Sequence, residues 1–570
     1  MRKITVIVNF ITHLTNPKSV PANTNTSKKV LRYFLVVALF AVVPFLSMSH
    51  YQYRHELTGS TSVIFAPGVV DSLKKALSSG AIGEDMTISG GKLLNYQSIR
   101  NFYSRNGYKP VWIRDNGLNG RATSLLYLIG HARAYGLDPD HYHASAITKV
   151  QQEFEEITRN NDNYLGAELE ILFTDAAFRF MVNLRYGYGP FDTLKVSGEL
   201  PEILHQGVVN GKIIRSILSV QPGFIEYTRL QRATEKFVNA APLTDQWVEI
   251  HQPVADSVIF FRQIGEVLKT LGYIDRQNQN TDIREAMKQF QHFHGLAPDG
   301  KAGINTVEAL GQTTLYKYKT LALNLDRLRK QQIPDSNQLL VNIPAYRLKI
   351  FEGNRLVDTF RVIVGNPSSP TPLLTARMEK IIANPVWYVP RSITMQEILP
   401  KLKTDSTYLI RNRMKILDSN YKQVDQETLN LAEATEAGFN YTLRQDRGSD
   451  NSLGQVKFVF SNPYSVYLHD TPGKQMFLKD IRAFSHGCVR VMDPERLAGY
   501  IIREINEGST NINELIAGGT HREIDITAPL LINIMYITCE ADENGNLYFY
   551  KDIYGMDRKE LQLFGMALDI

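Results

Sequence analysis

A cysteine and two histidines near residue 480 have the types and spacing that nucleophilic catalysis needs. Fifteen residues separate His469 from the run Ser485-His486-Gly487-Cys488. A cysteine attacks as its thiolate, and because its ordinary pKa is about 8.5 it needs a neighbouring imidazole or a positive field. Gly487 allows a tight turn and can leave backbone N–H groups free to face a developing oxyanion. These features predict Cys488 as a nucleophile and make both histidines candidates for its proton acceptor.

The elements around these residues are predicted to hold the thiol in an exposed loop. The residues up to His469 read as a strand, so the histidine stands at a strand end. Beyond the thiol, Asp493 is placed as the N-cap of a helix, with Pro494 at its first position and Glu495 in its first turn. Cys488 is therefore expected in the loop that leads into this helix.

The region that contains these motifs, 337–556, is predicted to be mainly β. Glu352-Gly353-Asn354 reads as a hairpin turn, and Asp542 to Gly545 as another. Besides the strand at 465–469, strands are expected at 340–345, 348–351, 360–364, 376–383, 456–460, 530–539 and 547–550. Residues 391–450 interrupt this pattern with a polar, helical segment, which is expected to form a lid inserted into the β domain.

The preceding region, 87–245, is predicted to be helical. Apolar residues recur at three- and four-residue spacing at 96–103, 122–134 and 168–184, and no cluster of chemistry-bearing residues accompanies them. A helical scaffold is the interpretation this supports.

A separate compact unit is predicted at 252–315. Its helices are expected at 260–271, at 283–293 and from about Asn305, with the turn-rich segment from His294 to Gly300 between the second and third. The fold class is therefore multidomain α+β: a helical scaffold, a small three-helix domain, and a mainly-β domain with a helical lid insertion.

Two stretches of the sequence resemble known families. The histidine, the spacer and Ser485-His486-Gly487-Cys488-Val489-Arg490 resemble the signature of the L,D-transpeptidase catalytic domain of the YkuD type. Residues 286–310, AMKQFQHFHGLAPDGKAGINTVEAL, resemble the three-helix peptidoglycan-binding domain. The order of the regions is similar to that of the large periplasmic YcbB-type members. The small unit is therefore interpreted as a peptidoglycan-binding domain, although a purely structural role remains an alternative.

The resemblance implies roles for individual residues. It makes Cys488 the nucleophile and His469 the general base and acid, with His486 in support and the backbone of Gly487 in the oxyanion region. The residues that it places at the substrate are Arg490, Ser485, Tyr467 and Trp387, and Tyr388, Arg447 and Asn451 are further candidates for the cleft. The planar guanidinium of Arg490 suits either the loop or a substrate carboxylate.

The reaction that the resemblance implies is acyl transfer between the stem peptides of peptidoglycan. The thiolate attacks the third residue of a tetrapeptide stem and expels D-alanine, and the amine of a second stem then takes the acyl group to give a 3→3 cross-link. Water as acceptor would make the protein an L,D-carboxypeptidase. No cofactor is expected, and the partners are donor and acceptor stems.

Three other interpretations compete with this one. A zinc-dependent wall peptidase could use His469, His486 and Cys488 as ligands, but the paired local spacing of zinc motifs is missing. Papain-like enzymes usually place their cysteine before their histidine, the reverse of this order. A catalytically inactive wall-binding protein would need only the small unit. A Cys488–Cys539 disulfide would block the chemistry, and Cys539 is expected in the core, within an apolar strand.

The N-terminus predicts export. Residues 1–32 contain six basic residues and no acidic one, and an uninterrupted apolar run of thirteen follows from Phe34 to Leu46. Residues 1–28 are interpreted as a cytoplasmic basic tail, 29–50 as a transmembrane anchor or a cleaved signal segment, and 51–86 as a connector. The expected location is thus the periplasmic face of a bacterial inner membrane, or the periplasm after cleavage.

Composition limits the remaining classes. A hydrophobic content of 43% with 21% charged residues is that of a globular protein, and 570 residues require several domains. The net charge of +5 is small for this length. Since no basic stripe occurs, a nucleic-acid partner is not expected.

Overall fold

The computed structural model describes residues 67–565, apart from 79–86, 89–90, 94, 115–116, 158–162, 190–192, 241, 247–256, 275–281, 332, 335 and 437. Contacts divide the chain into two units, 1–64 and 65–570, and all described residues belong to the second. The basic leader and the predicted membrane or signal segment at 29–50 lie outside the described residues. None of the described helices is both long and apolar enough to cross a membrane.

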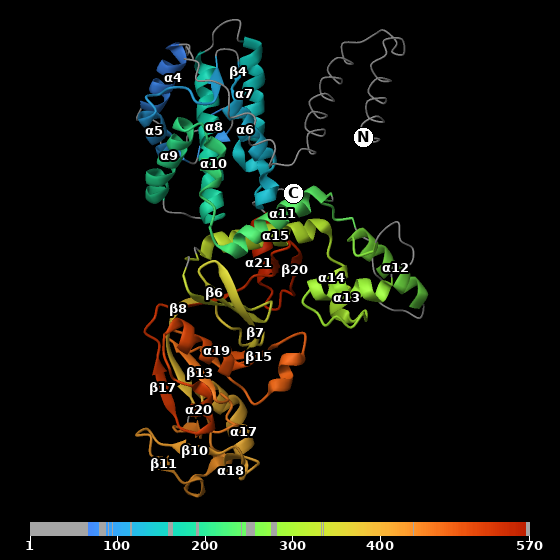
Figure 1. Ribbon diagram of the computed structural model, residues 1–570, viewed down its shortest axis with the longest axis vertical. Helices are drawn as coiled ribbons and strands as arrows, with labels where there is room; N and C mark the ends of the chain where they lie inside the picture. The colour runs from blue at the N-terminus through green and yellow to red at the C-terminus, as the bar shows by residue number, and fades with distance from the viewer. Residues whose placement is uncertain are drawn as a thin grey trace. The chain divides into compact units, whose positions relative to one another are not determined.

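The N-terminal helices surround one central helix, α8 (Figure 1). Helix α8 (Asn163–Tyr186) is apolar on nearly all sides, and such a helix must be buried by neighbours. Those that contact it are α4 (Pro67–Ser78), α5 (Tyr96–Arg105), α6 (Gly120–Gly130), α7 (Ala144–Ile157), α9 (Thr193–Val209) and α10 (Ile213–Leu218). Helix α4 falls in the segment 51–86 that is interpreted from the sequence as a connector, and its Val69, Leu73 and Leu77 are buried in the helical core.

One buried acidic residue of α8, Glu170, is structural. Glu170 is fully buried, and its carboxylate accepts hydrogen bonds from the N–H groups of Val111, Trp112 and Ile113 at 2.7–2.9 Å. The Tyr103 hydroxyl donates a fourth at 2.6 Å. Because all acceptor sites of this buried carboxylate are used, it fixes the neighbouring backbone to α8 and has no acceptor left for a substrate.

The three helices of the small unit lie where the sequence predicts them: α12 (Ser257–Thr270), α13 (Ile283–Phe293) and α14 (Ile304–Leu310). The connector between the last two is held by Gln291, whose Nε2 donates to Asp299 Oδ1 at 2.9 Å and whose Oε1 accepts from Gly300 N at 2.8 Å. Gly295 and Gly300 have φ values of 66° and 70°, which favour glycine, so these glycines are required by the turn.

Helices α11 (Ile225–Ala240) and α15 (Thr314–Gln331) pack on each other, and α15 carries a buried lysine without a carboxylate partner among the described residues. Lys317 is 3% exposed, and its Nζ lies 5.6 Å from the ring centroid of Phe290 and 5.5 Å from that of Phe549. Burial lowers the pKa of this amine to about 8. The folded protein therefore holds the proton less tightly than the unfolded chain does.

We expect Lys317→Met to stabilise the protein at pH 7 by about 2 kcal/mol, because the buried charge is removed and the apolar stem is kept. The advantage should shrink as pH rises from about 8 towards 10.5, where the unfolded chain also loses the proton. Thermal unfolding at pH 7 and pH 10 measures both effects. Lys319→Met on the same helix is the control, and a Lys317 variant that melts below wild type at pH 7 would contradict the expectation.

The C-terminal domain is built on a sheet that closes on itself. In the described residues the strands follow the order β13-β14-β16-β7-β6-β5-β18-β8-β17, β15 pairs with β7, and an additional pairing joins β13 to β8. Their bounds are β5 (Gln338–Asn342), β6 (Arg347–Glu352), β7 (Arg355–Gly365), β8 (Leu374–Ala383), β13 (Val456–Phe460), β14 (Leu468–His469), β15 (Ala483–Ser485), β16 (Val489–Val491), β17 (Arg522–Asp525) and β18 (Leu531–Met535). The closing pair sets Val456 directly opposite Ala383.

The inserted segment has strands as well as helices, which corrects the prediction of a helical lid. A four-stranded sheet has the order β11-β10-β12-β9. Its strands are β9 (Trp387–Tyr388), β10 (Met414–Leu417), β11 (Gln423–Val424) and β12 (Thr442–Gln445). Short helices α16 (Arg391–Ile393), α17 (Leu399–Leu402) and α18 (Tyr408–Arg411), with the π-helical turn η4 (Thr394–Ile398), pack on it around a separate core. These strands are too short for an alternating pattern to show in the sequence.

Three further local predictions were wrong. The strand expected at 530–539 is split: β18 joins the closed sheet, and β19 (Cys539–Ala541) forms a hairpin with β20 (Leu547–Phe549). Asp493 precedes helix α19 (Pro494–Tyr500) as expected, but its φ of 54° is left-handed and its side chain caps nothing. Cys488 directly precedes strand β16 and not a helix, because Val489 pairs with β14.

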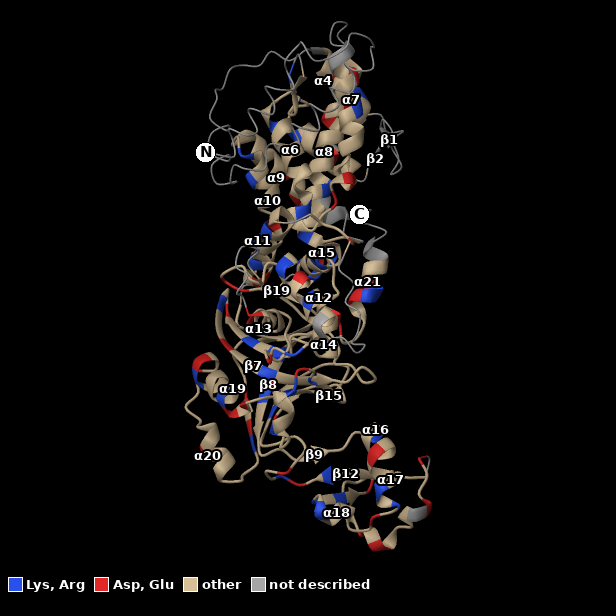
Figure 2. Cartoon of the chain, turned by 90° about the vertical axis from the view of Figure 1, so that its right-hand side faces the viewer, with Lys and Arg blue, Asp and Glu red and all other residues tan. Residues whose placement is uncertain are grey.

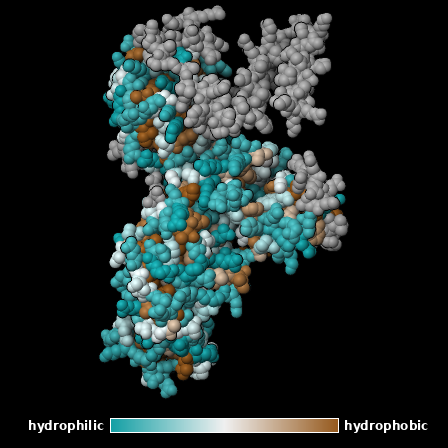
Figure 3. Space-filling view, viewed as in Figure 1, coloured by the Kyte–Doolittle hydropathy of each residue, from teal (hydrophilic) through white to brown (hydrophobic). Residues whose placement is uncertain are grey.

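Charges of both signs are interspersed over the described elements (Figure 2). The face drawn in Figure 3 is mainly hydrophilic where residues are described.

Candidate active site

The two sequence motifs meet through a parallel strand pair. Leu468 of β14 lies opposite Val489 of β16, and His469 lies opposite Arg490. Val489 N donates to Tyr467 O at 3.1 Å, so the pairing continues to the residue before each strand. Paired residues share a face and successive residues alternate, so the thiol-bearing residue before β16 lies on the same face as His469 and Arg490. The opposite face belongs to the core, where both Leu468 and Val489 are fully buried.

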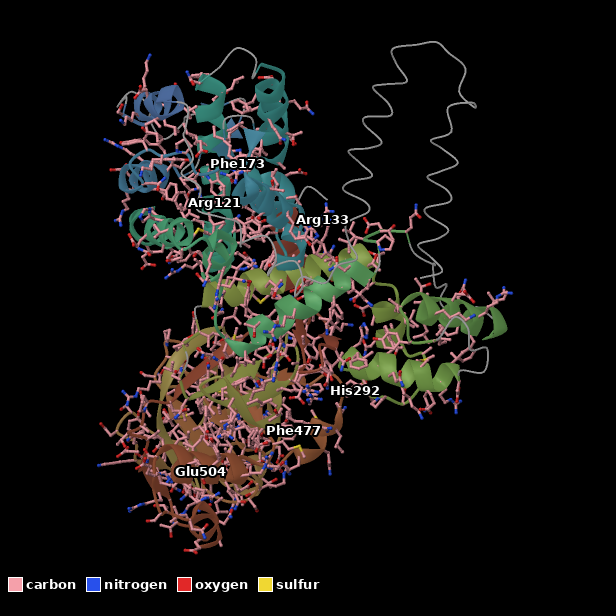
Figure 4. The ribbon with its side chains drawn as sticks, turned by 45° about the horizontal axis from the view of Figure 1, so that its top comes forward. Arg121, Arg133, Phe173, His292, Phe477 and Glu504 are labelled. Atoms are coloured by element: carbon pink, nitrogen blue, oxygen red, sulfur yellow. The ribbon has the colours of Figure 1, made fainter. Side chains whose placement is uncertain are left out.

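The segment between the motifs is anchored at both ends. At its start, the carboxylate of Asp470 accepts hydrogen bonds from Lys474 Nζ at 2.5 Å and from Gln455 N at 2.8 Å. Phe477, labelled in Figure 4, is fully buried near its middle. At its end, β15 pairs with β7. The position of the histidine relative to the thiol therefore depends on packing within the domain as well as on the strand pair.

His469 is held as a neutral imidazole. Its Nδ1 lies 2.5 Å from the carbonyl oxygen of Asp470, and because a carbonyl only accepts, Nδ1 carries the proton and Nε2 has the lone pair. The backbone of Leu453 is a second hydrogen-bonding neighbour of the ring. The ring is 5% exposed. Burial first, and then the charge of Arg490, lower the pKa of His469 to about 3. The resting site therefore has a neutral base and no imidazolium next to the thiol.

Cys488 is a half-buried free thiol, whereas Cys539 is a free thiol that is fully buried in β19. Burial raises the pKa of the Cys488 thiol, and four interactions oppose that shift: hydrogen bonds from the backbone and hydroxyl of Tyr467 and the charges of Lys457 and Arg490. The thiol is thus protonated at rest but surrounded by groups that favour its anion.

Ser485 and Gly487 shape the loop before the thiol. The Ser485 hydroxyl donates to the carbonyl oxygen of Cys488 at 2.5 Å and accepts from Gly487 N at 3.2 Å. Gly487 has a φ of 110°, and its carbonyl accepts a hydrogen bond from the Thr371 hydroxyl at 2.8 Å. The Gly487 N–H is already used by the Ser485 hydroxyl, and the placement of this loop's backbone in the oxyanion region stays a prediction. The N–H of Cys488 is the next backbone candidate along the loop.

His486 points to the inserted segment and not to the thiol's strand partner. It is exposed, and its Nε2 forms an ion pair with Glu397 of η4. The histidine that the sequence placed in a supporting role therefore joins the nucleophile loop to the lid. A zinc site would need this side chain to converge with His469 and Cys488, and no group of three or more potential ligands gathers anywhere in the described part of the chain.

Of the aromatic residues predicted for the cleft, Tyr467 and Trp387 are connected to the thiol by hydrogen bonds, whereas Tyr388 is exposed. Side-chain hydrogen bonds link Tyr467 both to Cys488 and to Trp387 of β9, and burial is the main reason that the pKa of Tyr467 is raised. Tyr388 is exposed on the lid, where its ring meets that of Tyr421 at 6.0 Å. Asn451 is fully buried and holds a turn by accepting from Leu453 N at 2.8 Å.

Arg447 is exposed on the turn between β12 and β13. Arg490, by contrast, lies on the face of the thiol, and its Nε is buried without a hydrogen-bond partner in the part of the chain described. Lys457 on this face was missed, although a single lysine within the apolar run 456–460 was a visible signal. Glu397 and Thr371 were also missed, and nothing in the sequence around them indicated that they lie near the site.

Three ranges of the chain match models of known protein families. Residues 336–511 match the model of the L,D-transpeptidase catalytic domain, YkuD. Residues 336–511 are thus similar to the catalytic domain of L,D-transpeptidases. This confirms the resemblance inferred from the two motifs. In front of the L,D-transpeptidase domain, residues 97–233 match a scaffold domain and residues 261–310 a putative peptidoglycan binding domain.

Individual relatives share the name of the domain. A putative L,D-transpeptidase of Haemophilus influenzae is 35% identical over 240 residues, which are 42% of this chain and 48% of the relative. The chain thus matches about half of that relative's length. Solved structures include an L,D-transpeptidase from Mycobacterium smegmatis (12% identity, TM-score 0.18, 35% of this chain and 58% of that one) and L,D-transpeptidase 1 of Mycobacterium tuberculosis (14%, 0.15, 35% and 62%). At these TM-scores the structural matches carry no argument.

Proposed function

We propose that this L,D-transpeptidase domain forms 3→3 cross-links between peptidoglycan stems by cysteine acyl transfer. The observation that carries the proposal is the strand pair that sets Cys488 on one face with a neutral His469, whose Nε2 has the lone pair that takes a proton. A site with these two groups and the hydroxyl of Tyr467 at the thiol suits attack on an amide carbonyl.

The proposed reaction has two halves. In the first, the Cys488 thiol gives its proton to His469, and the sulfur bonds to the carbonyl carbon of the third residue of a tetrapeptide stem. The C–N bond to the terminal D-alanine then breaks, and His469 returns the proton to the leaving amine. In the second, the side-chain amine of another stem gives a proton to His469, attacks the thioester and displaces the thiolate, which recovers that proton.

Arg490 is proposed to bind a carboxylate of the donor stem. Its Nε–H is buried and unpartnered within the described residues, so a planar anion would satisfy a donor that is otherwise costly to bury. It also lies in register with His469, directly beside the reacting groups.

The lid is proposed to exclude water so that an amine and not water takes the acyl group. Contacts of His486 with Glu397 and of Tyr467 with Trp387 connect it to the nucleophile loop. Exclusion of water favours transpeptidation over hydrolysis by the same thioester. Carboxypeptidation remains the alternative outcome if the lid stays open.

The peptidoglycan-binding domain is proposed to hold wall material next to the site. Its Ala297 N donates to Asp480 Oδ1 at 2.9 Å, within the segment that joins the two catalytic motifs. Lys551 Nζ lies 2.6 Å from Glu308 Oε2 and so links the domain to the C-terminal part of the chain. Export through the segment at 29–50, as anchor or as cleaved signal, remains part of the proposal, because the substrate is outside the cytoplasm.

The test is the product mixture made from disaccharide-tetrapeptide. The proposed function predicts a dimer one alanine residue lighter than two monomers linked by condensation, together with one free D-alanine per cross-link. Tandem mass spectrometry then locates the bond between two third residues. Release of D-alanine without dimer would show a carboxypeptidase, and neither product would overturn the proposal. Cys539→Ala is the matched control, since it removes the core thiol only.

A further inference from the structure

A lysine shares the face on which the proposed nucleophile lies. Lys457 of β13 is directly opposite His469 of β14, which is itself opposite Arg490 of β16. Three neighbouring strands thus place a lysine, a histidine and an arginine in one row across the sheet. The residues on either side of Lys457, Val456 and Phe458, are fully buried in the core, so the strand cannot turn this lysine elsewhere without exposing them.

This lysine contacts the tyrosine that also interacts with the thiol. Its Nζ lies 3.9 Å from the ring centroid of Tyr467, which is its diagonal neighbour just before β14. The hydroxyl and the backbone N–H of that tyrosine both interact with Cys488. A cation held against an aromatic face is well placed and partly shielded from water, so its field at a neighbouring atom is stronger than that of a surface lysine.

The charged groups around the thiol come from four strands. Arg490 of β16 and Lys457 of β13 are the cations, and His469 of β14 is neutral because of its burial. Glu523 of β17, across β8 from Lys457, is the nearest acid that influences the lysine, but it is exposed and pairs mainly with Lys380, 2.8 Å away. Burial raises the pKa of the Cys488 thiol, and the charges of Lys457 and Arg490 lower it. The effect of Lys457 is the larger of the two.

We propose that Lys457 is a positioning residue whose ammonium, held against Tyr467, favours the thiolate of Cys488 when the thiol proton moves to His469. The inference rests on the proposed function, in which that thiolate is the nucleophile. The proton leaves the sulfur for Nε2 of His469, and the ammonium keeps its own proton throughout. The lysine therefore supplies charge and not acid–base chemistry.

The test is the pH dependence of alkylation of Cys488 by iodoacetamide in the full-length protein, followed on the peptide that contains this cysteine by mass spectrometry. Lys457→Met should raise the pH at which the thiol becomes reactive by about one unit and lower the rate at pH 7 about tenfold. Lys457→Arg should stay within about threefold of wild type, because it keeps the charge. Lys380→Met, an exposed lysine on β8, should leave the profile unchanged.

Each other outcome overturns the inference. A methionine variant with the wild-type profile would show that the ammonium does not act on the sulfur, even if the variant releases D-alanine slowly. An arginine variant as impaired as the methionine variant would show that packing and not charge matters. Failure of the proposed function is seen separately: wild type would then show the reactive thiol and the shift on Lys457→Met but release no D-alanine.

Discussion

Cys488→Ala is expected to abolish D-alanine release and dimer formation, with a loss of at least about 10⁴-fold, because it removes the thiol that becomes acylated in the proposed reaction. Wild type incubated with donor stem alone should show a covalent adduct on the peptide that contains Cys488. The adduct mass should equal that of the donor after loss of D-alanine. Intact-protein mass spectrometry measures the adduct mass, and peptide mapping shows that the adduct is on the peptide that contains Cys488.

The control for this experiment is the second thiol. Cys539 is fully buried and its Sγ lies 3.7 Å from the carbonyl oxygen of Thr320. Burial raises its pKa well above the ordinary value, so this thiol is expected to be inert. Cys539→Ala should therefore keep both the activity and the adduct. An alanine variant at 488 that still made dimers would remove the nucleophile from the proposal.

His469→Gln is expected to slow acylation by about 10³-fold, since it removes the group that takes the proton from the thiol. The amide of glutamine can still donate to the carbonyl of Asp470, so the local packing is kept while the basic nitrogen is lost. Single-turnover measurement of D-alanine release reports this step directly. Because the pKa of His469 is about 3, the wild-type rate should not show a loss near pH 6.5 that arises from protonation of this ring.

His486→Gln is the matched comparison, and it should slow acylation much less than His469→Gln does. Its ring is exposed and contacts Glu397 of the lid, so its loss should weaken only that contact. Glu397→Gln, which removes the other half of the ion pair, should give a similarly small effect on acylation. The reverse ranking of the two histidines would transfer the role of base to His486.

Several helices of the described residues, and the longer strands of the closed sheet, could be predicted from periodicity. Helix α13 (Ile283–Phe293) has the predicted bounds, and the hairpin turn at Gly353 lies where the sequence signal placed it, with a φ of 56°. The family of residues 336–511 was also accessible, because the spacing from His469 to Ser485-His486-Gly487-Cys488 resembles the signature of that catalytic domain.

Features that depend on strand register could not be predicted. Nothing in the sequence shows that Lys457 and His469 are opposite each other, because their strands are paired only in the folded sheet. The hydrogen bond that occupies the Gly487 N–H depends on the rotamer of Ser485. The short strands of the lid were missed for a related reason: pairs such as Trp387 with Gln445 are made between segments far apart in the chain.

The closing pair of the sheet has a consequence for how this protein could diversify. Val456 lies directly opposite Ala383, so the two points at which the chain leaves and re-enters the sheet are neighbours about 5 Å apart. The whole lid, with its own core, is therefore topologically an enlarged hairpin turn. Its length and sequence can change, or be exchanged between relatives, without moving the ends of the strands that hold the thiol and the imidazole. The inserted segment can thus change during evolution, and with it the access of substrate, while the strands that hold Cys488 and His469 keep their register.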